Sequence, residues 1–86
     1  MNIALHHFKL VDTISKEGTL TKAAETLHLT QSALSPQLKE LERELDVEIF
    51  NRKGKRLHVS EQGYRFLRSS EKILAELRSL EEDINN

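Results

Sequence analysis

The sequence contains no cysteine, only one proline and three glycines, and few aromatic residues, at 5%. Without cysteine, disulfide frameworks, thiolate zinc sites and cysteine nucleophiles are excluded. The scarcity of proline and glycine argues against a loop-rich or low-complexity chain. No apolar run approaches the roughly 20 residues of a membrane span, and the N-terminus lacks the basic start and apolar stretch of a signal peptide. At 86 residues, 31% of them charged, the chain is predicted to form one small, helix-rich intracellular domain.

Charge is nearly balanced over the whole chain but unevenly placed along it. Lys and Arg number 13 against 14 Asp and Glu, a formal net charge of −1, which argues weakly against nucleic-acid binding. Residues 52–56, however, are Arg-Lys-Gly-Lys-Arg, whereas the tail from Ser60 onward carries more acids than bases. A local basic point can serve as an electrostatic footprint even in a neutral chain. The alternative is that this segment is only a solvated turn.

Apolar spacing and capping residues predict the first two helices. Apolar residues at steps of three from Leu5 to Ile14 indicate a helix over residues 3–17. Gly18 then stands where helices commonly end in the left-handed conformation. Thr21 is the expected N-cap of a short second helix that reaches about residue 27, and its paired alanines suggest close packing on another helix.

A third helix follows after a short turn. His28 occupies the turn position where glycine is common, and histidine tolerates a positive φ better than most residues. Thr30 is a natural N-cap for a helix from Gln31 to about Leu45. Four leucines spaced at steps of four, three and four give this helix one apolar face, with charged residues expected on the outer face. The apolar face is formed by Leu34, Leu38, Leu41 and Leu45, and the outer face by Glu40, Glu42, Arg43 and Glu44.

The sequence pattern in the second half of the chain predicts a hairpin and one long helix. Residues 48–52 and 56–59 are β-compatible runs around Gly54, and Ser60 caps a helix that runs to the C-terminus. Apolar residues recur along that helix with heptad spacing, which is typical of a helix pairing seam. The alternative is a helix that packs only on its own domain. The residues of the seam are Phe66, Leu67, Ser70, Ile73, Leu74, Leu77, Leu80 and Ile84.

Two helices joined by a short turn form a helix-turn-helix, whose second helix can enter the major groove of DNA. Gln31, Ser32 and Ser35 lie in the first turns of that helix, where side chains reach base edges. Glutamine pairs bidentately with adenine, and serine serves bases or phosphates. The alternative is an ordinary helical hairpin with a polar first turn.

The run from Leu20 to Ser35, LTKAAETLHLTQSALS, resembles the signature of LysR-type bacterial transcriptional regulators. Within that family, residues 27–35, LHLTQSALS, are most similar to the branch that regulates methionine biosynthesis. The similarity extends over nearly the whole chain, through Phe8, Val11, Ile14, Gly18, Gln37, Leu38, Leu41, Glu42, Leu45, Ile49, Phe50, Arg52 and Ser60 to Gly63. It implies a mostly α fold, a winged helix-turn-helix of three helices and a small β-hairpin wing over residues 1–59. A dimerisation helix over residues 60–86 would follow, pairing with a second copy through the heptad seam.

The resemblance also implies partners and contacts. The chain is expected to bind double-stranded DNA as a homodimer, in the bacterial cytoplasm and not at a membrane. Base or phosphate contacts from the recognition helix would come from Thr30, Gln31, Ser32, Ser35, Pro36 and Lys39. Backbone or minor-groove contacts would come from Thr21, Lys22, Arg52, Lys53, Lys55 and Arg56. Full-length relatives continue into an effector-binding domain, so the chain is expected to be a fragment that lacks inducer sensing.

Pro36 departs from the family pattern, in which Arg or His is common at that position. As the sixth helical residue it loses the bond to the Ser32 carbonyl, at a nominal cost of about 3 kcal/mol. One interpretation is a tolerated kink near the helix start. The other is that the bend re-aims residues 31–35 in the groove and alters sequence preference.

Other functions find little support in the sequence. It contains no Ser-His-acid constellation, phosphate-binding glycine loop or carboxylate pair, so we predict neither an enzyme nor a cofactor. The four histidines lack ligand spacing, which argues against a metal site. The rival function is a protein-interaction module that grips a partner through the last helix. Such a module would not show the steep salt dependence of phosphate contacts.

Overall fold

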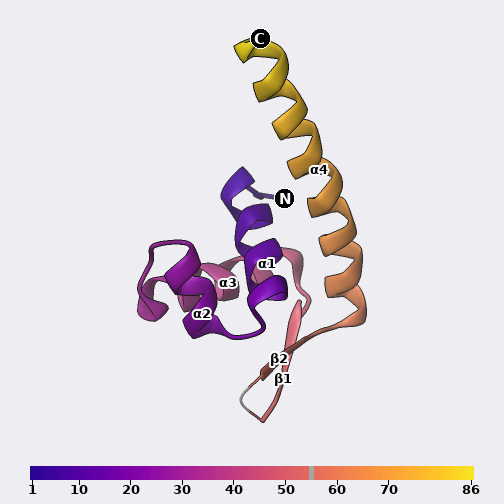
Figure 1. Ribbon diagram of the computed structural model, residues 1–86. Helices are drawn as coiled ribbons and strands as arrows, with labels where there is room; N and C mark the ends of the chain where they lie inside the picture. Colours follow the sequence, from indigo (N-terminus) through magenta and orange to yellow (C-terminus); the bar gives the residue numbers. More distant parts are fainter. Residues whose placement is uncertain (55) are drawn as a thin grey trace.

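A computed structural model describes residues 1–54 and 56–86, so the predicted DNA contact at Lys55 lies outside the described residues. Three helices come first, then a two-stranded antiparallel hairpin and one long helix (Figure 1). The molecule measures 46 × 26 × 19 Å because the last helix projects beyond the other elements, away from the hairpin tip. The predicted mostly α, winged helix-turn-helix fold is confirmed. The elements are α1 (Leu5–Glu17), α2 (Leu20–Thr26), α3 (Gln31–Leu45), β1 (Phe50–Lys53), β2 (Arg56–Val59) and α4 (Glu61–Asn85).

The helix ends follow the capping signals, with one correction. Gly18 ends α1 at φ 81°, and Thr30 caps α3 by accepting the Ala33 N–H at 3.1 Å, both as predicted. The N-cap of α2 is Thr19 and not Thr21, because the Thr19 hydroxyl accepts the N–H of Lys22, three residues on. Thr21 is already the second helical residue, which frees its side chain for another contact.

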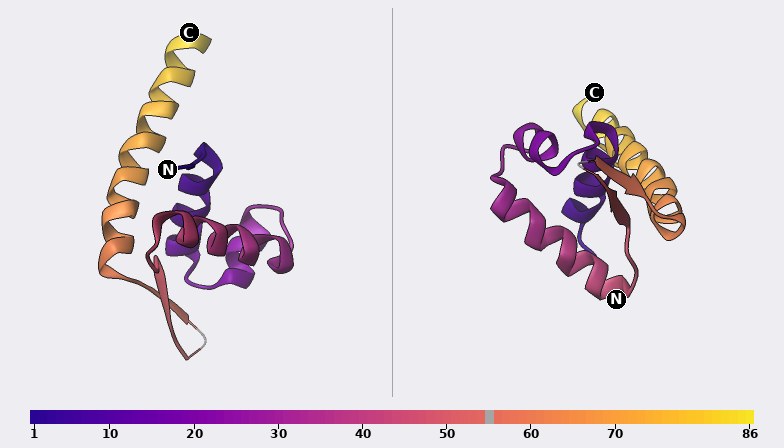
Figure 2. Two further views of the ribbon diagram at one scale, coloured as in Figure 1. Left: turned by 180° about the vertical axis from the view of Figure 1, so that it is seen from behind. Right: turned by 90° about the horizontal axis from the view of Figure 1, so that it is seen from below.

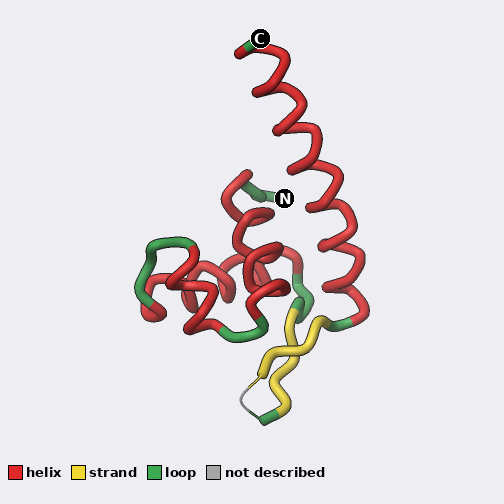
Figure 3. Tube along the Cα trace, in the orientation of Figure 1, coloured by secondary structure: helices red, strands yellow, loops and turns green. Residues whose placement is uncertain are grey.

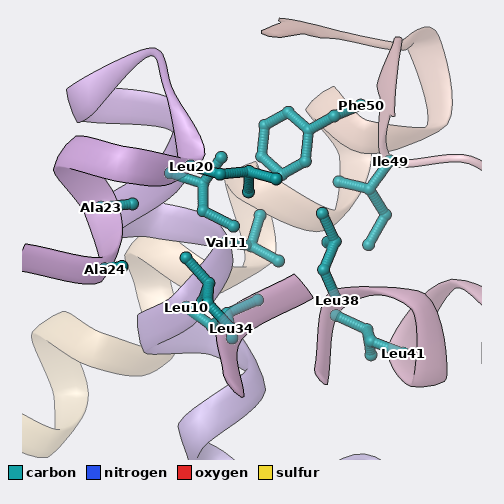
Figure 4. Close-up of a cluster of buried hydrophobic side chains, with 11 residues drawn as sticks. Leu10, Val11, Leu20, Ala23, Ala24, Leu34, Leu38, Leu41, Ile49 and Phe50 are labelled. Carbon is teal, nitrogen blue, oxygen red and sulfur yellow. The ribbon is translucent and has the colours of Figure 1, made fainter. Parts of the chain in front are cut away.

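The hydrophobic core lies between the first three helices and the base of the hairpin (Figure 4). From α3, Leu34, Leu38 and Leu41 are buried as predicted, and Ile49 and Phe50 close the core from the hairpin side. On α1 the buried residues are His7, Leu10, Val11 and Ile14, so the predicted stripe was wrong at Leu5, which is 41% exposed. Leu5 is the first residue of α1. Phe8 is half-buried and stacks on Phe66 of α4, with ring centroids 5.2 Å apart.

The hairpin projects from the helical body as a wing (Figure 3). Its register pairs Phe50 with Val59 and Lys53 with Arg56. Of β1 only Phe50 is buried, so the basic residues toward the tip lie in solvent. The first strand begins two residues later than predicted, since Glu48 and Ile49 form the approach to the strand and not part of the ladder.

The long helix α4 divides into a covered and a free half, as the views in Figure 2 make clear. Ser60 caps it by accepting the Gly63 N–H at 2.9 Å, as predicted. The first half packs along α1, where Ser70 is fully buried and Leu74 is 9% exposed. The second half extends past α1, and Leu80 and Ile84 are 52% and 73% exposed.

Stability is expected to fall as the pH drops below about 6.5, because of His7. Its imidazole is 6% exposed, and its Nδ1 accepts the Ala4 N–H at 2.9 Å. Burial, and then His6, lower the pKa of His7, while Glu40 and Glu44 act in the opposite direction. The unfolded chain therefore takes up the proton first, so acid favours unfolding.

Urea unfolding of His7→Gln at pH 7.5 and pH 5 measures this contribution. The difference in the free energy of unfolding between pH 7.5 and pH 5 should be smaller in this variant than in the unsubstituted protein. The control His58→Gln removes an exposed histidine that is not among the groups acting on His7, and it should keep the full difference in stability. An unchanged pH dependence in His7→Gln would contradict the assignment.

Candidate nucleic-acid interface

A tight turn joins α2 to α3 and sets the angle between them. His28 adopts φ 58°, so the prediction of a positive φ at this residue is confirmed. The Leu29 N–H donates to the Ala24 carbonyl at 2.8 Å, which closes the end of α2. With Ala23 and Ala24 buried against the other helices, the turn leaves the start of α3 at the surface.

The sequence-predicted contact residues of α3 share one outward side of the helix. Gln31, Ser32, Pro36 and Lys39 are exposed, and Ser35 is half-buried. We call these five residues the exposed α3 face. The opposite side of the helix supplies the core, so the amphipathic pattern alone fixes which side faces out.

Hydrogen bonds hold the polar groups at the start of α3. Thr30 Oγ1 lies 3.1 Å from the Ser32 hydroxyl in addition to its capping bond. Thr21 Oγ1 on α2 donates to Gln31 Oε1 at 3.0 Å. The sequence predicted both Thr21 and Gln31 as contact residues but gave no sign that they contact each other.

Pro36 does not end the recognition helix, since α3 is continuous from Gln31 to Leu45. With Ser35 and Lys39 it lines one side of an open groove of about 660 Å³. The end of α3 and the approach to β1 supply the rest of the lining, which is Glu42, Arg43, Asp46, Val47 and Glu48. A tolerated kink and a bend that alters sequence preference both remain open as interpretations of Pro36.

The wing carries exposed cations, and the start of its second strand contacts the corner between α1 and α2. Arg52, Lys53 and Arg56 are all exposed. The Leu57 N–H donates to the Gly18 carbonyl at 3.2 Å, and the Arg56 guanidinium lies directly against Gly18. A side chain at residue 18 would meet that guanidinium, but this is the flexible end of an exposed side chain that can move aside, so glycine is required here for its φ of 81°.

Glu42 joins the recognition helix to the wing, a role that the sequence reasoning missed. Its Oε2 accepts the N–H of Ile49 at 2.7 Å and that of Phe50 at 3.4 Å. The prediction that Glu42 covers the outer face of the helix was therefore wrong. Helical periodicity places Glu42 beside Leu38 and Leu41, but no local sequence pattern predicts that its carboxylate accepts the backbone N–H of Ile49, seven residues later.

The structure divides the predicted dimer seam in two. Ser70 and Leu74 are buried against the chain's own domain, so these two cannot be free interface residues, whereas Phe66 and Leu67 are half-buried and pack on the core, and their place in the interface stays a prediction. The domain covers Ser70 and Leu74 because α4 lies along α1 for its first half. The remaining four form what we call the free α4 row: Ile73, Leu77, Leu80 and Ile84, of which Leu77 is half-buried and the others are exposed.

This geometry defines a class of protein. A short helix, a turn and a second helix with an exposed polar start are the parts that dock in a DNA major groove. A hairpin with exposed cations beside them supplies charge for the phosphate backbone. The arrangement is that of a winged helix-turn-helix DNA-binding domain.

Comparison with known proteins gives the family. The family model described as bacterial regulatory helix-turn-helix protein, lysR family, matches residues 5–64. The chain belongs to this family, which confirms the resemblance found in the sequence. A probable RuBisCO transcriptional regulator of Phaeodactylum tricornutum is 41% identical over 71 residues, covering 83% of this chain and 23% of that protein.

Solved structures agree with this fold. The BenM_DBD/catB site 1 DNA complex aligns with a TM-score of 0.91 at 25% identity, covering 96% of this chain and 93% of that chain. Full-length OxyR C199D from Pseudomonas aeruginosa aligns with a TM-score of 0.89 at 27% identity, over 98% of this chain and 28% of that one.

The matches also bear on function class and extent. The name of this relative is that of a probable transcriptional regulator, in line with the predicted class of protein. The chain spans about a quarter of that relative's length. Among residues 1–54 and 56–86, no helix combines the length and apolarity needed to cross a bilayer.

Proposed function

We propose that this chain binds double-stranded DNA sequence-specifically, as a homodimer, with α3 in the major groove. The observation that carries the proposal is the exposed α3 face, whose polar start is held by bonds from Thr21 and Thr30. A similar chain, BenM_DBD, was solved as a complex with DNA, which supports the same use of the fold here.

The proposed contacts divide by chemistry. The exposed α3 face and Thr30 supply polar groups for base edges and nearby phosphates. Lys22 on α2 and the exposed cations of the wing supply charge for the backbone or minor groove. The wing cations are Arg52, Lys53 and Arg56, with Lys55 beside them in the sequence.

Dimerisation is proposed through the free α4 row, which would pack on the same row of a second copy. The chain then divides by role into residues 1–59, which bind DNA, and residues 60–86, which join the copies. Because the first half of α4 packs on α1, this division separates roles and not independently folded units.

For the whole protein we propose a transcriptional regulator of the bacterial cytoplasm, with inducer sensing in a further domain. The methionine-biosynthesis branch stays a prediction. The relative named above is called a RuBisCO regulator, and its name lends that branch no support.

Replacing Arg52 with alanine tests the backbone contact. Removing one phosphate contact should lower the slope of log affinity against log salt by about 0.9 and weaken all duplexes alike. Fluorescence anisotropy of labelled duplexes over a salt series measures both quantities. Arg68→Ala is the matched control, since it removes one exposed cation from α4, away from the wing.

An equal slope in Arg52→Ala and Arg68→Ala would contradict the role of the wing. Failure of the unsubstituted protein to bind any duplex at low salt would contradict the proposed function itself. That result would favour the rival interaction module, which depends on the apolar residues of α4.

A further inference from the structure

The bond between Thr21 and Gln31 bears on which base α3 selects. It crosses from α2 to α3 between two exposed side chains ten residues apart, with the Thr21 hydroxyl donating to Gln31 Oε1 at 3.0 Å. From the sequence, Thr21 was predicted to contact the phosphate backbone, and Gln31 was predicted to pair bidentately with adenine. The bond changes both roles.

A glutamine amide has one acceptor oxygen with two lone pairs and one NH₂ group with two donors, and these two groups diverge from one carbon of a planar amide. Pairing with adenine uses the acceptor and one donor of the amide, since Oε1 accepts from N6 while Nε2 donates to N7. Thr21 turns Oε1 toward α2, so Nε2 is directed away from α2. An amide held in this way offers donors to the groove. Guanine, with acceptors at both N7 and O6, matches them better than adenine.

Both ends of the bond are anchored. Thr21 is β-branched, so its χ1 is stiff, and it sits in α2 two residues before the buried Ala23. Gln31 is the first residue of α3, directly after the N-cap Thr30. The bond therefore restrains a long side chain before any DNA is present, which reduces the rotamer freedom that binding would otherwise remove.

We propose that Thr21 is a positioning residue that holds Gln31 as a hydrogen-bond donor, so that the site prefers guanine to adenine where Gln31 meets DNA. The inference rests on the proposed DNA binding and deepens it. It assigns Thr21 a role in specificity that a phosphate contact would not have.

The test compares base preference among four proteins, each used to select from a random duplex library. Loss of preference in Gln31→Ala marks the position that Gln31 contacts. There the unsubstituted protein should enrich guanine over adenine. Thr21→Val, which keeps the shape but removes the hydroxyl, should shift that ratio toward adenine by about fivefold or more. Thr21→Ser keeps the donor and should keep the guanine preference.

A second measurement uses the selected duplex with 7-deazaguanine at the same position. Loss of the N7 acceptor should weaken binding of the unsubstituted protein more than that of Thr21→Val. In a Gln31→Ala background, Thr21→Val should have no further effect on base preference, because the group that it positions is gone.

Three results would overturn the inference while leaving DNA binding intact. They are an unchanged ratio in Thr21→Val, an equal loss across all duplexes in that variant, and no position that depends on Gln31. Absence of any enriched duplex with the unsubstituted protein at low salt would instead overturn the proposed function.

Discussion

Replacing Leu80 with aspartate is expected to convert the dimer to monomers and to weaken binding to duplexes with two half-sites by about a hundredfold. Leu80 is 52% exposed in the single chain, so its substitution should leave the fold intact. In a dimer through the free α4 row, each Leu80 would be buried, and a carboxylate there would lose its hydration without a partner. Because the row repeats on both copies, one substitution acts twice.

Sedimentation or light scattering measures the mass, and titration of duplexes with one or two half-sites measures the affinity. Affinity for a single half-site should change little, since α3 is untouched. Ser79→Asp adds the same charge to an exposed position one residue away, on another side of α4, and should leave the dimer in place. An unchanged mass for Leu80→Asp would contradict the pairing of the free α4 row.

Replacing Gly63 with alanine is expected to destabilise the fold by about 2 kcal/mol. A methyl group at this residue of α4 would overlap the carbonyl oxygen of Ile49 and crowd the Val59 side chain. Ile49 has little room to move, since it is fully buried, its N–H is held by Glu42 and its carbonyl accepts the Ser60 N–H at 2.8 Å. The clash should outweigh the gain in helix propensity, which is about 1 kcal/mol.

Thermal unfolding followed by circular dichroism measures the effect. For a domain of this size, a loss of about 2 kcal/mol lowers Tm by roughly 10 °C. Gln62→Ala is the matched control, because it places an alanine at an exposed position in the same helical turn without a clash and should leave Tm nearly unchanged. A Tm for Gly63→Ala that equals or exceeds that of the unsubstituted protein would contradict the close approach.

Features that depend on neighbours in the sequence could be predicted from it. The bounds of α3 follow from a cap at Thr30 and four spaced leucines, and the end of α1 follows from Gly18. The hairpin and the start of α4 were likewise marked by Gly54 and Ser60. These signals act within one helical turn or one β-turn, so no knowledge of the tertiary fold is needed to interpret them.

Features that depend on distant segments could not be predicted. A heptad pattern identifies the apolar side of α4, but only the packing on α1 decides that Ser70 and Leu74 are covered and Leu80 is not. Glu42 resembles any exposed helical glutamate until the turn brings Ile49 to it. The N-cap of α2 is Thr19, two residues before the predicted Thr21. Thr21 is therefore free to donate to Gln31, a bond that the predicted cap did not allow for.

Two copies of α3 are proposed to lie in the major groove of one duplex, and site-directed cleavage tests this placement most directly. Since the chain has no cysteine, Glu40→Cys gives one attachment point for an iron chelate on α3, outside the proposed contacts. On a selected duplex, we expect two clusters of cuts with major-groove offset, about one helical turn or a multiple of it apart. A chelate on Glu82→Cys, near the far end of α4, should not give them. Equal cutting by both proteins, or no localised cutting from α3, would contradict this placement.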